Sequence, residues 1–103
     1  MELTKKIFAE IIGTFIFLGT IIVVVNVLKN DGINFLKIGL ALSIAIVIFG
    51  SISGGHYNPG VSFMFYLNRQ LSTVELVAYI LSQLIGATLA FTMFKLMYAS
   101  SSS

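Results

Sequence analysis

The stretch Ser51-Ile-Ser-Gly-Gly-His-Tyr-Asn-Pro-Gly60 lies inside a run that carries no charged residue from position 38 to position 68. At 1.5 Å per residue, one helix over that run would be about 46 Å long, which exceeds the roughly 30 Å hydrocarbon core of a bilayer. Gly54 and Gly55 weaken helix formation, and Pro59 cannot occupy a helix interior without the loss of a hydrogen bond. The sequence therefore predicts that the helix breaks at this stretch.

The segment after the break is short and apolar. Asn58 is a favourable N-cap residue, and Pro59 suits the first position of a helix. A helix over residues 59–67 would be about 14 Å long, so it can enter the membrane but cannot cross it. The polar residues at 68–70 then return the chain to an interface. This pattern predicts a re-entrant half-helix.

Two further uncharged runs, at 11–28 and 76–94, flank this region. Each would form a helix about 27–28 Å long, which fits one membrane crossing. Together with the segment before the break, they predict an all-α membrane protein with three transmembrane helices and one re-entrant half-helix. We expect one unit over residues 1–98, followed by a polar tail at 99–103. The expected elements are helices over about 7–28, 35–53 and 74–98 and the half-helix over 59–67.

Composition excludes several classes of protein. Hydrophobic residues make up 57% of the chain and charged residues 10%, whereas a soluble domain has about 25% charged residues. The absence of cysteine from the sequence removes disulfide and thiol chemistry. The single histidine has no partners at metal-ligand spacing, so no metal is expected. The sequence suggests no acid–base pair, no cofactor and no cluster of basic residues, which disfavours an enzyme and a nucleic-acid partner.

The break itself is the candidate site. Non-helical backbone at membrane depth is tolerated only where protein buries it or water reaches it. Beside a cavity, the carbonyls of residues 53–58 would act as acceptors, and the start of the half-helix would present the Asn58 amide. The partial positive charge of a helix N-terminus disfavours cations but leaves hydrogen bonds for neutral polar solutes. The alternative is a plain Asn-Pro cap in an interfacial loop; the uncharged sequence on both sides favours re-entry.

The stretch Ile52-Ser-Gly-Gly-His-Tyr-Asn-Pro-Gly-Val61 resembles the first signature loop of the aquaporin and glycerol-facilitator (major intrinsic protein) family, whose usual form is Ser-Gly-Ala-His-x-Asn-Pro-Ala-Val. The resemblance covers about residues 7–98 and corresponds to the N-terminal half of the family's fold. Other matching residues follow in the family's order: Ala9-Glu10 and Gly13-Thr14-Phe15 in the first helix, Gly39-Leu40-Ala41 in the second, and Tyr79, Gln83, Gly86 and Ala87 in the third.

The resemblance implies a channel for passive permeation of water or small neutral solutes such as glycerol. In such a channel Asn58 would donate a hydrogen bond to the solute, and Pro59 would start the half-helix. Ile38 would contribute to a selectivity constriction. The carbonyls that would line one vestibule belong to Gly54, Gly55 and His56. From its surroundings in the sequence, the His56 side chain is expected to pack in the loop or to form a hydrogen bond on the pore side.

The resemblance also implies that Glu10 hydrogen-bonds the re-entrant loop and holds it in place. From the sequence alone, the Glu10 side chain could instead reach the membrane–water interface. A carboxylate within the membrane is costly unless it has a partner, so we favour the interpretation in which Glu10 anchors the loop. Gln83 is expected to form a hydrogen bond between helices. Two positions depart from the family pattern: Gly60 stands where alanine is usual, and Val61 stands where the second half of the family's fold has arginine.

Family pores contain two inverted repeats, and this chain resembles one of them. We therefore expect the pore to be completed by oligomerisation in the lipid bilayer, with a homo-oligomer or a full-length aquaporin as partner. The alternatives are a non-conducting half-length partner and a fragment of a full-length aquaporin. Basic residues are equally divided between the two sides of the membrane, so the positive-inside rule does not set the orientation of the chain. This balance leads to the hypothesis that two antiparallel copies meet at Asn58. The residues on one side are Lys5, Lys6 and Arg69, and those on the other are Lys29, Lys37 and Lys95.

Overall fold

The computed structural model describes residues 2–28 and 32–98. The polar tail expected at 99–103 lies outside the described residues, as does Lys29. All regular elements in the described part of the chain are helices: α1 (Leu3–Asn26), α2 (Asn34–Ser53), α3 (Pro59–Leu67) and α4 (Thr73–Tyr98). Three of them, α1, α2 and α4, are long and apolar enough to cross a membrane. The predicted fold class, three membrane spans with a half-helix, is confirmed.

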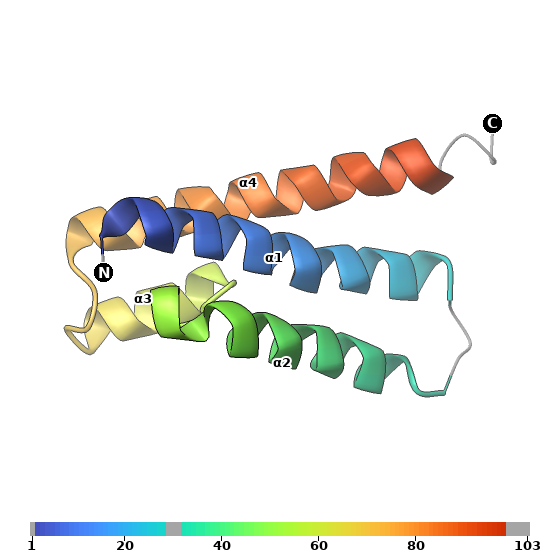
Figure 1. Ribbon diagram of the computed structural model, residues 1–103, viewed down its shortest axis with the longest axis horizontal. Helices are drawn as coiled ribbons and strands as arrows, with labels where there is room; N and C mark the ends of the chain where they lie inside the picture. Colours follow the sequence, from blue (N-terminus) through green and yellow to red (C-terminus); the bar gives the residue numbers. More distant parts are fainter. Residues whose placement is uncertain (1, 29–31, 99–103) are drawn as a thin grey trace.

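The central helix of the bundle is α1, which packs against α2 on one side and against α4 on the other (Figure 1). After α2 ends, residues 54–58 turn back toward the middle of the bundle. From there α3 runs out to the end of the bundle that holds the N-terminus, and it packs against α4. This reversal of the chain direction is the geometry of a re-entrant segment.

The first helix differs from its expected bounds. It begins at Leu3 rather than near Ile7, and it ends at Asn26. The expected start had been set by where the chain enters the membrane. No glycine or proline lies between Leu3 and Ile7, and lysine is a good helix former, so the helix extends past the apolar region.

Local sequence signals define the ends of the other helices. The last residue of α2 is followed by Gly54, which has a left-handed backbone with φ +91°. The N-cap of α3 is Asn58, whose Oδ1 accepts a hydrogen bond from the Gly60 amide at 2.7 Å. At the start of α4, Ser72 and Glu75 exchange hydrogen bonds between side chain and backbone at 3.0 and 3.1 Å, which forms a capping box.

The burial pattern is inverted relative to a soluble protein. Large apolar side chains cover the outside, and Val47 and Leu96 are 81% and 78% exposed. The interior is built from small residues and polar groups. The buried polar side chains are Glu10, Thr14, Ser53, His56, Ser62, Ser82 and Gln83. Together with the three apolar spans, this pattern makes the chain an integral, multi-pass membrane protein.

Small residues on α4 bring it close to α1. A Cβ placed on Gly86 would lie only 2.6 Å from the carbonyl oxygen of Ile11. Ser82 and Ala90, one turn before and one turn after Gly86, are also buried. Close helix packing in membranes depends on such small side chains, because they let the backbones approach. The tight contact fixes the Glu10 region of α1 against α4.

Candidate functional site

The carboxylate of Glu10 is the centre of a buried polar network, and the side chain has no exposed area. Its Oε2 accepts hydrogen bonds from the Ser53 hydroxyl at 2.7 Å and from the His56 amide at 3.1 Å. Its Oε1 accepts from the Tyr57 amide at 2.9 Å and from Gln83 Nε2 at 3.0 Å. Because all of these partners are donors, the arrangement suits an ionised carboxylate. Glu10 therefore ties the loop to both α1 and α4.

A second set of bonds extends the network into α3. Gln83 Nε2 also donates to Ser62 Oγ at 2.9 Å, and Ser62 Oγ lies 2.9 Å from His56 Nδ1. Since Ser62 accepts from Gln83, its own proton is free to bind Nδ1, which favours the His56 tautomer with hydrogen on Nε2. The His56 ring stacks on Phe65 with centroids 4.6 Å apart and planes 15° apart. The His56 side chain thus packs inside the loop.

The end of α2 is held by Tyr79. Its hydroxyl donates to the Ser53 carbonyl at 2.6 Å, and its side chain is buried. Because α2 ends at Ser53, this carbonyl lacks the usual helical partner. Among the described residues, the Tyr79 hydroxyl is the donor that satisfies it.

Replacing Tyr79 with phenylalanine is expected to lower the free energy of unfolding by about 1–3 kcal/mol, because the Ser53 carbonyl would stay buried without a partner. The matched control is Tyr66→Phe, which removes a hydroxyl from an exposed 3.3 Å contact with Thr73 and should change it by less than about 0.5 kcal/mol. Denaturation in detergent micelles, followed by circular dichroism, measures both variants. Equal losses in the two variants would contradict this account.

Gly54 and Asn58, at the two ends of the loop over residues 54–58, are exposed, whereas His56 and Tyr57 are buried. Asn58 is exposed, and its Oδ1 is already bonded to the Gly60 amide. Within the described part of the chain, no donor reaches the carbonyls of Gly54, Gly55 and His56. These carbonyl oxygens and the Asn58 Nδ2 group are therefore without a hydrogen-bond partner among the described residues.

The structure divides the predicted site residues into three places. Glu10, Gln83 and the His56 side chain belong to the buried network. The exposed start of α3 holds Asn58, Pro59 and Gly60, with the partly exposed Val61 beside them. Ile38 is not part of either group: it lies near the start of α2, about 22 Å along the helix from Ser53.

Three members of the network were not predicted from the sequence: Ser53, Tyr57 and Ser62. Ser62 gave the clearest signal, because it is the small polar residue in the otherwise apolar α3. It lies one turn after Asn58, on the buried side of the helix. Its partner Gln83 is 21 positions away in the sequence, so the contact could not be read from local spacing.

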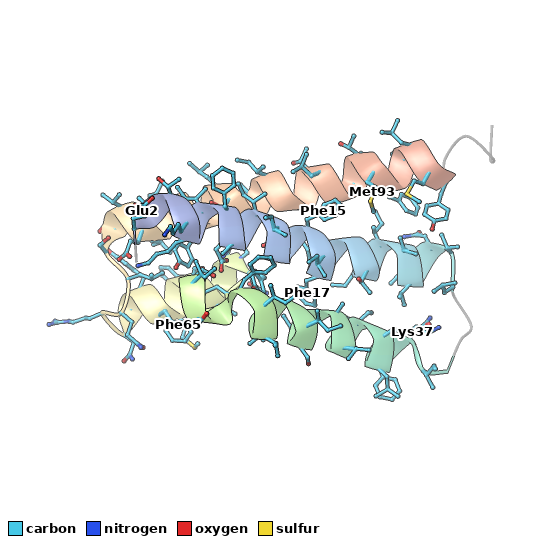
Figure 2. The ribbon with its side chains drawn as sticks, in the orientation of Figure 1. Glu2, Phe15, Phe17, Lys37, Phe65 and Met93 are labelled. Atoms are coloured by element: carbon cyan, nitrogen blue, oxygen red, sulfur yellow. The ribbon has the colours of Figure 1, made fainter. Side chains whose placement is uncertain are left out.

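A pocket of about 250 Å³ opens beside the network at the N-terminal end of the bundle. The Lys6 ammonium in its wall pairs with Glu75 Oε2 at 2.8 Å. Phe65, another lining residue, lies at the end of the bundle opposite Lys37 (Figure 2). Its remaining lining residues include Ser53, Gly54, His56 and Tyr79.

Known proteins are similar to this chain in sequence. The sequence model of the family described as "Major intrinsic protein" matches residues 1–103. The chain is 42% identical over 89 residues to Glycerol uptake facilitator protein-like 6 of Lactiplantibacillus plantarum, covering 84% of this chain and 40% of that protein. It is 39% identical over 100 residues to Aquaporin NIP1-1 of Zea mays, covering 91% of this chain and 36% of that protein. Nodulin-26 of Glycine max is 36% identical to it over 100 residues, and the match covers 91% of this chain and 37% of that protein.

The chain spans well under half the length of these curated relatives. The family match extends over the whole sequence and agrees with the three apolar spans. This chain belongs to the major intrinsic protein family of membrane channels.

Proposed function

We propose that the chain forms one wall of a channel through which water or small neutral solutes such as glycerol pass passively. The observation that carries the proposal is the orientation of Asn58. Its Oδ1 is held by the Gly60 amide at 2.7 Å, so its Nδ2 group is directed away from that bond and is free to donate to a solute. Because the cap fixes the side chain, the donor is positioned before a solute arrives.

The groups around Asn58 support a neutral solute. The free carbonyls of Gly54, Gly55 and His56 offer acceptors ahead of the Asn58 donor, and water or a polyol can use both. The N-terminus of α3 carries a partial positive charge, which disfavours cations. The buried Glu10 carboxylate is surrounded by its own donors and does not face the solute. Relatives named as aquaporin and glycerol uptake facilitator support the same class of solute.

We propose that a second unit completes the pore, because the surface that bears Asn58, Pro59 and Gly60 is exposed in the single chain. A second copy of this chain or a full-length relative could supply the other wall. Basic residues at both ends of the bundle, Lys5 and Lys6 at one and Lys95 at the other, support an antiparallel pair. In this arrangement Ile38 and Val61 would narrow the pore with apolar side chains.

The Asn58→Asp variant tests the role of the amide. Aspartate keeps the Oδ1 acceptor for the Gly60 amide but removes both N–H donors. We expect the osmotic water permeability of proteoliposomes to fall about 10-fold, which corresponds to the loss of one hydrogen bond worth about 1.4 kcal/mol. The unfolding midpoint should stay close to that of the wild type. The control is Asn68→Asp, in the exposed turn after α3, which should leave permeability unchanged.

Stopped-flow light scattering on vesicles that contain the 103-residue chain provides the measurement. A normal permeability in Asn58→Asp would contradict the proposed role of Asn58. If wild-type vesicles match empty vesicles at every protein density, the proposal that this chain conducts by itself fails. That result would favour the two alternatives, a non-conducting half-length partner or a fragment of a full-length aquaporin.

A further inference from the structure

Tyr57 holds a backbone conformation that bulky residues rarely adopt. Its φ angle is +52°, and its side chain is 1% exposed. Its neighbours with positive φ, Gly54 and Gly55, have no side chain to oppose this conformation. A strained residue persists only where its surroundings hold it firmly, and such residues gather at functional sites. The contacts that hold Tyr57 in this conformation therefore indicate its role.

Each part of Tyr57 contacts a different element. Its amide donates to Glu10 Oε1 at 2.9 Å. Its ring lies against α1 at Gly13, where an added Cβ would be 2.0 Å from Tyr57 Cε1. Its hydroxyl donates to the Ala45 carbonyl, in the middle of α2, at 2.7 Å. Tyr57 thus joins the loop to both α1 and α2.

The bond to Ala45 connects two parts of the proposed pore. Asn58 follows Tyr57 directly, so the contacts of Tyr57 determine the position of the Asn58 backbone and of the side-chain amide that it carries. Ala45 lies two helical turns after Ile38 in α2, about 10 Å along the helix. The Tyr57 hydroxyl therefore fixes the position of Asn58 along the axis of α2, the helix that also carries Ile38. This contact is made by the Tyr57 side chain, whereas Glu10 holds the loop at the backbone amides of His56 and Tyr57.

We propose that Tyr57 is a positioning residue that determines solute specificity. Its hydroxyl bond to Ala45 fixes where the loop lies against α2, and this position sets how far the Asn58 amide reaches into the proposed pore and which size of solute can pass it. This inference rests on the proposed channel function. When the bond is lost, the loop can shift along α2, and a larger neutral solute gains permeability relative to water.

The test uses Tyr57→Phe, which keeps the ring against Gly13 and removes only the hydroxyl. In a regular helix the Ala45 carbonyl still accepts the Phe49 amide, so it stays paired and the fold is preserved. Tyr66→Phe is the matched control, because it also removes a hydroxyl with a side-chain contact, outside the loop. Both variants are prepared in proteoliposomes of the same lipid composition.

The first measurement is amide hydrogen–deuterium exchange. In Tyr57→Phe we expect the amides of His56, Tyr57 and Gly60, each hydrogen-bonded in the wild type, to exchange about 3- to 10-fold faster, as for one lost hydrogen bond. Exchange in α4 should match the wild type. A merely structural role would raise exchange in α4 as well. Wild-type exchange rates at these three amides in Tyr57→Phe would overturn the inference, whatever the permeability.

The second measurement is the ratio of glycerol to water permeability. We expect the ratio to rise about 3- to 10-fold in Tyr57→Phe and to stay at the wild-type value in Tyr66→Phe. An unchanged ratio in conducting Tyr57→Phe vesicles would overturn the specificity role. If wild-type vesicles do not conduct, the proposed function fails instead; the exchange measurement still decides whether the Tyr57 hydroxyl positions Asn58.

Discussion

Replacing Glu10 with glutamine is expected to lower the free energy of unfolding by about 3–5 kcal/mol, the cost of removing one partner from a buried charged network. The carboxylate accepts bonds from Ser53, His56, Tyr57 and Gln83, and both of its oxygens are used. Glutamine has one oxygen and one NH₂ group, so in either orientation the NH₂ group would lie against a backbone amide, that of His56 or that of Tyr57, which cannot accept its hydrogen bond. The loop should then separate from α1, and permeability should fall with it.

Chemical denaturation in micelles measures this loss, and proteoliposome permeability measures its consequence for function. The matched control is Glu2→Gln, at the exposed start of the chain, where the change should be within about 0.5 kcal/mol. If Glu10→Gln unfolds at the same denaturant concentration as the control, Glu10 does not anchor the loop.

Gly13→Ala is the second substitution with a large expected effect. The new Cβ would lie 2.0 Å from Tyr57 Cε1 and 2.4 Å from Cζ, distances that require the ring to move. Tyr57 is held at three points, so the strain would spread to the loop. We expect a loss of about 3 kcal/mol in the free energy of unfolding, at the upper end of ordinary overpacking. Denaturation of the purified variant in micelles measures it.

Gly39→Ala is the matched control, because a Cβ at Gly39 meets nothing within 4 Å. It should be neutral or stabilise α2 by up to about 1 kcal/mol, through helix propensity. A double-mutant cycle then identifies the cause of the Gly13→Ala effect. In a Tyr57→Ala background, Gly13→Ala should cost less than about 1 kcal/mol, because the ring is gone. An undiminished cost would show that the clash with Tyr57 is not the cause.

Much of the fold could be predicted because the membrane imposes strong rules on sequence. Charge positions marked the three spans, and the length limit of a bilayer required the break before Pro59. Capping chemistry then placed the start of α3 at Asn58. The start of α1 was misplaced because a helix can continue beyond the apolar region that the membrane selects.

The buried network was only partly predictable. A carboxylate in an apolar helix signals a partner, so Glu10 stood out on physical grounds. Its partners Ser53 and Gln83 lie 43 and 73 positions away, and no local pattern pairs them. Tyr57 could not be distinguished from a packing aromatic, because its function depends on a backbone angle and on the absence of a side chain at Gly13.

The most direct test of the account is the membrane depth of α3. The sequence contains no cysteine, so single cysteines at positions 61, 64 and 67 can carry spin labels without interference. Electron paramagnetic resonance with oxygen and a nickel chelate as relaxation agents then reports the depth of each label in liposomes. The re-entrant geometry predicts the greatest depth at Val61, a smaller depth at Met64 and an interfacial position at Leu67. Equal shallow depths, or a depth that increases toward Leu67, would contradict it.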